Sequence, residues 1–567
     1  MRKLKLVFLL VIFFQPLKSL HAKNYAADLV IVDAYIYTAN ERQPRASALA
    51  IKDNRIVYVG DQKGTDNYID DETDIIELAG KMLLPGFVDT HNHIFEGASQ
   101  IGGNCQLDKH LALQKQTSNL KVCQSQVVTK DTWVIGYGHQ LDVLMSEVIE
   151  DTPREFLDHF FPNNPVIIME ESSHSMLVNS NALRLAGINS ESDHPQGGRI
   201  MFDEKGEPNG ILFDNAGDSV MELAWNAQSD VFQQSYDGLL DGISEVSANG
   251  ITSVGDGRLY WRRGWYEVWE KARTEGELTL RVSLRPWVYP EIPLDSQLKI
   301  LKEMYDPNIN SLLIVDQVKM YSDGVLHFGT AKMLRPYNES MQVNDPKGLN
   351  YIPPRRLNKW ISELRNLGYG AHIHAVGDAG IRQSVDAIQK ERIKGSQLRY
   401  GLTHLELIDP IDIKRFSKLN IDADFQAGAD SFADHSWAEY LVGKKRAKQM
   451  FLMRDLFDTG VNITFSSDWT VNPLNPLVAI ANSVRWSHKQ GLPNIDEAIY
   501  AATLNGAKAL GLASITGSIE VGKSADLVVL GRDITRLNPD QIEQTKILMT
   551  IFRGEVVYGR DYHIDEK

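Results

Sequence analysis

The chain has 567 residues, of which 43% are hydrophobic and 23% charged, and it contains two cysteines. This composition excludes collagen-like, low-complexity, disulfide-scaffold and coiled-coil proteins. Acidic residues outnumber Lys and Arg by 74 to 59, and the net charge of −15 argues against a nucleic-acid partner. The length fits three or four ordinary domains, or one large α/β domain with smaller additions.

The first 22 residues have the pattern of an export signal. Arg2, Lys3 and Lys5 precede an apolar run at 6–14, and Ala22 provides a small residue before a cleavage point. A permanent anchor is the less favoured alternative, because a hydrocarbon core takes about 20 apolar residues to cross. Removal of 1–22 takes away four basic residues, which leaves 55 basic against 74 acidic residues and a net charge of −19. We expect an exported protein, periplasmic or secreted, without stable membrane insertion.

Cys105 and Cys123 are the only cysteines of the chain. Export would permit a disulfide between them, and two reduced thiols are the alternative. With thiolate ligands essentially unavailable, any metal site must use histidine and oxygen donors.

Short β-rich runs occupy both ends of the chain after the signal. The runs near the N-terminus, at 28–33, 36–38, 48–51 and 55–59, are separated by Asn, Asp and Gly, which is typical of a meander of antiparallel strands. A run at 527–530 and a hairpin at 549–558 have the same character. The simplest prediction is one small β-sandwich domain, formed by 23–82 together with 515–567. Two unrelated β arms are the alternative.

Between these ends, short apolar runs alternate with amphipathic helical stretches, as in a parallel sheet with crossover helices. The candidate strands are 83–90, 250–255, 280–284, 317–321, 369–374, 400–404, 421–425 and 462–466. Eight such units predict an α/β fold, a (β/α)8 TIM-like barrel over 83–514, with catalytic groups at the C-terminal ends of the strands. The long segment 94–249, between the first two strands, is predicted to be an insertion over the active site.

A His-Asn-His triplet closes the first strand of this series, in the run Leu84-Pro-Gly-Phe-Val-Asp-Thr-His91-Asn-His93. Strand side chains alternate between faces, so His91 and His93 point the same way and can bind one metal ion. Alone, such a pair is more often structural. Whether His91 and His93 bind a metal therefore depends on which residues lie at the other strand ends.

Further metal-binding residue types lie at other predicted strand ends. His374 and His404 each end a strand, Asp468 follows another, and Lys319 lies within a fourth. The ends of parallel barrel strands meet at one rim. We therefore expect four histidines, a carboxylate and a lysine to come together there.

The motifs that carry these residues are 85–93, Val318-Lys-Met-Tyr-Ser-Asp-Gly324, His374-Ala-Val-Gly-Asp378, Ser467-Asp468 and 517–528. With them, the chain resembles the metal-dependent amidohydrolase superfamily. Within it, the chain is similar to the amidohydrolase family 3 (YtcJ-like) branch, which includes N-substituted formamide deformylases. The resemblance runs over essentially the whole chain after the signal. It extends into the long insertion through 173–183 and Gly206-Glu-Pro-Asn-Gly210.

The resemblance implies a ligand set of His91, His93 and Asp468 for the more buried metal and His374 with His404 for a second. Lys319 stands at the position that bridges both metals in many relatives, after its amine has reacted with carbon dioxide to form a carbamate. An ammonium group cannot bind a cation, whereas a carbamate offers two anionic oxygens. The alternative is an unmodified lysine beside a single metal. One or two divalent ions are implied. Zinc fits a ligand set rich in imidazole, and iron, manganese, nickel and cobalt are alternatives that the sequence does not separate from it.

The predicted function is hydrolysis of a non-peptide amide bond in a small molecule. A divalent metal lowers the pKa of water from about 15.7 towards 7, which makes hydroxide available near neutrality. Asp468 would take up the proton of that water and deliver it to the leaving nitrogen. Alternatives on the same fold are a deaminase or a hydrolase of ester or cyclic substrates, and a non-catalytic binding protein is a further one. Lys319 argues against the deaminases of this superfamily, and retention of all six ligand positions argues against a dead barrel.

Four other residues carry weaker expectations. His174, Asp378 and Trp469 are candidates for substrate binding, and for His174 a structural hydrogen bond is an equally favoured alternative. For Asp378, a role in orienting its loop or a ligand is the favoured alternative, and for Trp469 the alternative is packing. His372 shares the strand face of His374 one layer deeper, which favours barrel filling over ligation.

Two departures from the branch limit any inference about the substrate. A motif that usually reads Arg-Ile-Glu-His is here Gly401-Leu-Thr-His404, and Gly-Ser-Asp is here Ser466-Ser-Asp468. Both changes keep the predicted ligands, His404 and Asp468, and replace residues next to them. Specificity for formamides is therefore not inherited, and the sequence leaves a homo-oligomer open.

Overall fold

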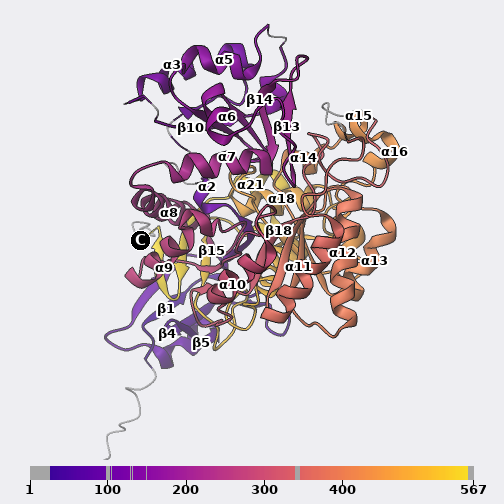
Figure 1. Cartoon of the computed structure of the whole chain (residues 1–567). Helices are drawn as coiled ribbons and strands as arrows, with labels where there is room; N and C mark the ends of the chain where they lie inside the picture. Colours follow the sequence, from indigo (N-terminus) through magenta and orange to yellow (C-terminus); the bar gives the residue numbers. More distant parts are fainter. Residues whose placement is uncertain are drawn as a thin grey trace, which may run out of the picture.

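The computed structural model describes residues 26–97, 103, 105–127, 129–130, 132–147, 150–338 and 345–559. The predicted export signal at 1–22 lies outside these residues. Figure 1 shows three parts: a mixed α/β body, strands of the N-terminal part beside strands of the C-terminal part at the bottom, and a separate sheet with its helices at the top. No helix in the described ranges has the length and apolar character needed to span a membrane.

Two sheets contain the strands near the chain ends. The first has the order β5-β4-β1-β6, and the second has the order β25-β24-β23-β7-β2-β3 and so combines both ends of the chain. Their bounds are β1 (Leu29–Val32), β2 (Tyr35–Tyr37), β3 (Arg45–Ala46), β4 (Ala48–Lys52), β5 (Arg55–Gly60), β6 (Asp74–Glu77), β7 (Met82–Pro85), β23 (Leu527–Leu530), β24 (Ile547–Phe552) and β25 (Glu555–Tyr558). The expected purely antiparallel meander is wrong in part, because β1 pairs with β6 and β2 with β7 in parallel.

Two parallel sheets form the centre of the body. One has the order β17-β16-β15-β8 and the other the order β18-β19-β20-β21-β22. Their bounds are β8 (Phe87–Asn92), β15 (Ile251–Asp256), β16 (Arg281–Ser283), β17 (Leu313–Ile314), β18 (Gln317–Tyr321), β19 (Gly370–Ala375), β20 (Tyr400–His404), β21 (Ile421–Phe425) and β22 (Ile463–Phe465). Nearly every residue of these strands is buried, as expected for strands covered on both faces.

Hydrogen bonds join the two parallel sheets at both edges. At one edge, the Val288 N–H donates to the Lys319 carbonyl at 3.1 Å, and the Lys319 N–H donates to the Pro286 carbonyl at 3.0 Å. At the other edge, the Thr90 hydroxyl donates to the Phe465 carbonyl at 3.1 Å. The C-terminal ends of β8, β18, β19, β20 and β22 are thereby brought to one region of the body.

Helices follow most of these strands and cover them from outside (Figure 1). They are α8 (Val231–Ala248), α9 (Trp265–Glu275), α10 (Leu294–Met304), α11 (Pro354–Leu367), α12 (Asp378–Ile393), α13 (Pro410–Leu419), α14 (Asp430–Ala433), α15 (Ala438–Val442), α16 (Lys444–Ala447), α17 (Met453–Phe457), α18 (Pro476–Arg485), α19 (Ile495–Ala501), α20 (Leu504–Ala509) and α21 (Pro539–Glu543). The N-terminus of α13 is capped by a side chain: the Asp409 carboxylate accepts the Ile411 N–H, with Pro410 at the first helical position.

A six-stranded sheet is built from residues that lie between β8 and β15 in the sequence, and we call it the insertion sheet. Its order is β13-β14-β12-β11-β10-β9. The bounds are β9 (Cys105–Gln106), β10 (Val134–His139), β11 (Val166–Glu170), β12 (Ser175–Val178), β13 (Gly198–Phe202) and β14 (Pro208–Asp214), with α3 (Thr117–Ser125), α4 (Leu141–Leu144), α5 (Pro153–Phe160), α6 (Ser180–Ala186) and α7 (Asn215–Asn226). Cys105 and Cys123 form a disulfide there, which decides between the two alternatives that the sequence left open.

The first strand of the predicted series, 83–90, is divided in the structure. β7 joins the sheet shared by the chain ends, and β8 joins the parallel sheet. Gly86 separates them, and a side chain there would collide with Thr252, whose Oγ1 would lie 2.2 Å from an added Cβ. The sequence did not indicate this break, because the two strands are adjacent and both are apolar.

Candidate metal centre and active site

A cavity of about 380 Å³ is lined from two sides, by the C-terminal ends of the parallel strands and by the insertion sheet. The lining includes His93, His374, His404 and Asp468 from the strand ends, and Glu170 and His174 from the insertion sheet and its loop. Functional groups of parallel α/β folds gather at this end of the strands. We call His91, His93, Lys319, His374, His404 and Asp468 together the histidine rim.

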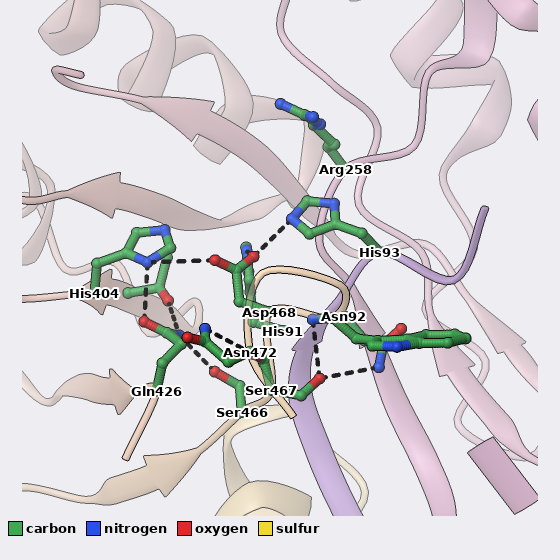
Figure 2. A network of polar contacts seen from close by, with 12 residues as sticks. His91, Asn92, His93, Arg258, His404, Gln426, Ser466, Ser467, Asp468 and Asn472 are labelled. Carbon is green, nitrogen blue, oxygen red and sulfur yellow. Dashed lines mark hydrogen bonds and ion pairs between the residues drawn. The ribbon is translucent and has the colours of Figure 1, made fainter. Parts of the chain in front are cut away.

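His91 and His93 lie at the end of β8, and both turn toward the same carboxylate oxygen. Their Nε2 atoms lie 3.2 and 2.9 Å from Asp468 Oδ1, and Figure 2 shows His93 reaching Asp468 from one side. Both imidazoles are almost fully buried. Burial lowers the pKa of His91 well below its usual value, so the ring is neutral and able to bind a metal.

Asp468 follows β22 with φ at +52°, in a region that residues other than glycine rarely adopt. Its N–H donates to the His91 carbonyl at 2.9 Å, and the Ser467 hydroxyl beside it donates to Asp89 at 2.5 Å. Burial alone would raise the pKa of Asp468, but hydrogen bonds from His91 and His93 hold it well below its usual range. The carboxylate is therefore ionised, fixed in place and available as a ligand.

Lys319 lies in the middle of β18 and is completely buried. Its Nζ lies 3.2 Å from both ring nitrogens of His91. Burial lowers the pKa of Lys319 well below its usual value, although the charge of Asp468 opposes this. The amine is thus held in the uncharged form, which is the form that can react with carbon dioxide.

His374 and His404 end the neighbouring strands β19 and β20, and their ring centroids lie 4.4 Å apart. His374 Nε2 donates to the Gly324 carbonyl at 3.0 Å, which leaves Nδ1 with its electron pair, buried and without a partner. His404 Nδ1 donates to Gln426 Oε1 at 2.9 Å, so its Nε2 keeps a free electron pair. Burial lowers the pKa of His404 to about 3. Each ring is therefore neutral and has one nitrogen with a free electron pair that can bind a metal.

The rim suits a divalent metal ion by its donor chemistry. Donor atoms of His91, His404 and Asp468 lie within 4.8 Å of one another. Neutral imidazoles and an ionised carboxylate are ligands of zinc and similar ions. Among the described residues, the buried Nδ1 of His374 has no hydrogen-bond partner, and its ring centroid lies 4.4 Å from that of His404. The residues present therefore fit the metal that the motifs imply.

Side chains behind the rim hold the ligands in place. His372 Nε2 lies 3.0 Å from His91 Nδ1, one layer deeper in the strands, so it contacts a candidate ligand. Gln426 bonds both His404 and the Ser466 hydroxyl (Figure 2). Such supporting partners fix the tautomer and direction of a ligand histidine.

His174 reaches the cavity from the insertion sheet. Its Nδ1 lies 2.6 Å from Oδ1 of Asp214, whose carboxylate is fully buried. The imidazole stacks on Tyr321 and lies with its centroid 5.0 Å from that of His374. The structure thus brings this residue to the rim, although it is far from it in the sequence.

Trp469 and Asp378 have different positions. Trp469 lines the cavity beside Asp468. Asp378 begins α12, and its Oδ1 accepts the Leu334 N–H at 2.7 Å. Asp378 is not among the described residues that line the cavity, so its position supports the loop-orienting role.

Several polar cavity residues had no motif to reveal them. Arg258 donates through Nε to Glu96 at 3.2 Å and through Nη1 to the Tyr321 hydroxyl at 2.9 Å, and Figure 2 places it next to His93. Glu170 and Glu406 also line the cavity. The signal available for Arg258 was its place just after β15, since side chains that follow barrel strands line the site.

Comparison with known proteins supports this description. Residues 74–558 match the model of a family described as the amidohydrolase family. The chain is 29% identical to the protein YtcJ of Bacillus subtilis (strain 168), over 93% of this chain and 98% of that one. It is 24% identical to an N-substituted formamide deformylase of Arthrobacter pascens, over 94% of this chain and 98% of the relative.

Among solved structures, an uncharacterized metal-dependent hydrolase from Pyrococcus horikoshii OT3 superimposes with a TM-score of 0.70 at 21% identity, over 90% of this chain and 99% of that one. This likeness indicates an α/β fold of the TIM-barrel type. The family match spans most of the chain and includes the whole histidine rim. The chain therefore belongs to the amidohydrolase family and is a metal-dependent hydrolase of carbon–nitrogen bonds in small molecules.

Proposed function

We propose that this protein is an exported amidohydrolase that cleaves a non-peptide amide bond, with Asp468 as the proton carrier. The observation that carries the proposal is the convergence of His91 and His93 on Asp468 Oδ1 at 3.2 and 2.9 Å, within a cavity of about 380 Å³. An ionised carboxylate in this position can accept a proton from water and return it to a leaving nitrogen.

The proposed ligands are His91, His93 and Asp468 for one divalent ion and His374 with His404 for a second, with zinc as the metal. Lys319, as a carbamate, would bridge the two. Bound there, such ions supply Lewis acidity, which acidifies water and polarises a carbonyl group. The carbamate is supported by the buried, uncharged Lys319 amine, 3.2 Å from His91.

The other cavity residues would position the substrate. His174, held by Asp214 through its Nδ1, keeps Nε2 for a hydrogen bond to the substrate. Trp469 offers a flat apolar wall beside Asp468. The insertion sheet, which supplies His174 and Glu170, closes the cavity and reduces its contact with water, which strengthens the electrostatic interactions inside.

We propose a (β/α)8 barrel over 83–514, with 94–249 as its insertion and with 23–82 and 515–567 as a split β-sandwich domain. The joined edges of the two parallel sheets support the barrel. Pairing of β23 with β7 and of β7 with β2 supports the split domain.

Export to the periplasm or the medium is the proposed location. It is supported by the basic and apolar pattern of 1–22 and by the Cys105–Cys123 disulfide, a bond that persists in oxidising compartments. Fractionation of cells that express the full chain, with N-terminal sequencing, tests this. A mature chain in the extracytoplasmic fraction that begins at residue 23 is expected, and an uncleaved cytoplasmic chain would contradict export.

Metal-reconstituted protein assayed against N-formyl, N-acyl and cyclic amides tests the activity. Release of the amine is expected, with the Asp468→Asn variant as the inactive control. Hydrolysis of esters with no amide cleaved, or ammonia release from an amidine-type substrate, would instead support the ester hydrolase or the deaminase.

A further inference from the structure

The active-site cavity carries far more negative than positive side chains. Six carboxylates line it, and the only Lys or Arg among its described lining residues is Arg258. The carboxylates belong to Glu96, Asp142, Glu170, Glu171, Glu406 and Asp468. This imbalance distinguishes the cavity from a site built for an anionic substrate.

Half of these carboxylates already have partners. Glu96 pairs with Arg258 at 3.2 Å, and Glu171 pairs with Lys109 at 2.8 Å. Asp468 faces the imidazoles of the histidine rim. Since Arg258 also bonds Tyr321, its guanidinium is engaged on two sides.

The remaining carboxylates have no ion pair with a basic side chain in the described ranges. They are Asp142, Glu170 and Glu406. Asp142 is exposed, and Glu170 is buried and bonded to the hydroxyl and N–H of Ser172. Glu406 differs from both, because its Oε2 is buried and has no hydrogen-bond partner among the residues that the structure describes.

The backbone around Glu406 is fixed in an unusual conformation. His404 and Leu405 both have positive φ, at 75° and 49°. The Phe451 N–H donates to the Glu406 carbonyl at 2.8 Å, and the Leu407 N–H donates to Val376 at 3.0 Å. Because this backbone is anchored, the Glu406 side chain has little freedom to find a partner. A buried carboxylate oxygen without a hydrogen bond destabilises the folded chain unless a ligand binds it.

Aromatic side chains line the same cavity as Glu406. They belong to Trp437, Phe451 and Trp469, with Tyr321 nearer the rim. Aromatic faces attract cations, and a carboxylate among them gives a directed charge-assisted hydrogen bond to an ammonium group.

We propose that Glu406 is a specificity-determining residue that binds a positively charged amine of the substrate. The substrate class is then a small amide that carries an alkylammonium group away from the bond that is cleaved. The inference rests on the proposed function, because it takes this cavity as the site of amide hydrolysis. The exposed Asp142 carboxylate adds to the negative field that attracts such a cation, whereas burial raises the pKa of Glu170 to about 8 and keeps that carboxyl largely neutral.

Binding to the metal-loaded full chain tests the inference without turnover. Butylammonium and 1-butanol, probes of similar size and different charge, are titrated by calorimetry at one ionic strength. We expect butylammonium to bind about 10- to 100-fold more tightly, as a hydrogen bond to a charged group implies. The Glu406→Gln variant, whose side chain keeps the same shape, should lose this preference.

Glu171→Gln is the matched control, since it makes the same change in the same cavity at a carboxylate already paired with Lys109. It should keep the preference. Equal binding of the two probes by the wild-type protein, or a preference that survives in Glu406→Gln, would overturn the inference. Melting temperatures of both variants exclude unfolding as the cause.

Kinetics separate this inference from the function on which it rests. N-acetyl-1,4-diaminobutane and N-acetylpentylamine differ mainly by an ammonium in place of a methyl group. We expect kcat/KM to favour the charged amide by about 10-fold or more, and this ratio to fall towards one in Glu406→Gln. Equal hydrolysis of both amides would overturn the inference and leave the proposed function standing. A wild-type preference for butylammonium with no amide hydrolysed would contradict the proposed function instead.

Discussion

The histidine rim and the insertion sheet face the same cavity, but they are built in different ways. The rim takes its residues from the ends of buried parallel strands, and its side chains contact one another directly. The insertion sheet contributes Glu170, at the end of β11, and His174, in the loop before β12, and the ring centroid of His174 lies 5.0 Å from that of His374. We therefore expect the chemistry to depend on the histidine rim, and the shape and charge of the cavity to depend also on the insertion sheet.

This difference predicts how the two regions respond to mutation. Changes at the rim should remove metal binding or proton transfer, and changes at the insertion sheet should alter substrate handling with the metal retained. The predictions below test that division.

Replacement of Asp468 by Asn should have the largest effect. The variant loses an anionic ligand and the proposed proton carrier together, so kcat/KM should fall about 100- to 10,000-fold. The melting temperature should change far less than the activity, since Asn has the same shape. Steady-state kinetics on the best amide of the panel, with circular dichroism, measure both, and a nearly normal turnover number would refute the assigned role.

Replacement of Lys319 by Ala should come next. If a carbamate bridges two metals, the variant should lose most activity, and added short carboxylic acids should restore part of it by occupying the vacated space. Mass spectrometry under non-denaturing conditions should show the extra carboxylate on the wild-type chain. Full activity of Lys319→Ala without any added acid would show that no carbamate is needed.

Replacement of Gln426 by Leu tests the layer behind the rim. Gln426 accepts the Nδ1 hydrogen bond of His404 at 2.9 Å, so the variant frees that ring to rotate. Loss of such a supporting partner typically costs about 10- to 100-fold in metal affinity or activity. Competition with a chelator measures the metal affinity, and an unchanged value would place His404 outside the metal site.

Replacement of Asp214 by Asn tests the insertion sheet in the same way. The Asp214 carboxylate bonds His174 Nδ1 at 2.6 Å. We expect kcat/KM to fall about 10-fold with the metal content unchanged, because the change disorients a substrate-facing ring and no ligand. Loss of metal in this variant would contradict the prediction that the rim binds the metal and the insertion sheet acts only on the substrate.

The smallest expected effect concerns acid stability. His139 ends β10 in the insertion sheet and is fully buried, neither ring nitrogen has a hydrogen-bond partner in the described part of the chain, and burial lowers its pKa to about 3. The unfolded chain binds a proton there below about pH 6.5, whereas the folded chain does not, so stability is lost as pH falls from about 6.5 towards 3. The His139→Leu variant should therefore lose less melting temperature between pH 7.5 and pH 4.5 than the wild-type chain does. An unchanged difference would show that His139 does not contribute.

Much of the parallel-strand body could be predicted from the sequence. Predicted strands such as 317–321 and 421–425 coincide with β18 and β21, in which apolar residues alternate with polar ones, a pattern typical of strands. Membership in the amidohydrolase family was predicted from motifs and is confirmed. The ligand roles of the rim residues stay predictions that the variants above test.

The parts of the fold and of the site that were not predicted depend on contacts between distant residues, which a sequence pattern does not reveal. The break at Gly86 was hidden between two apolar strands, and parallel pairing of β1 with β6 joins segments far apart in sequence. Arg258 and Glu406 carry no motif, and only the folded chain shows that one is bound to Glu96 while the other has a carboxylate oxygen without a partner. Periodicity places elements, but it does not report which side chains meet.

Metal content measured together with activity tests the central claim most directly. Protein purified from the full chain should contain one to two equivalents of a divalent metal by inductively coupled plasma mass spectrometry. Chelation should abolish amide hydrolysis, and stoichiometric zinc should restore it. Undiminished hydrolysis by protein shown to be free of metal would contradict the account.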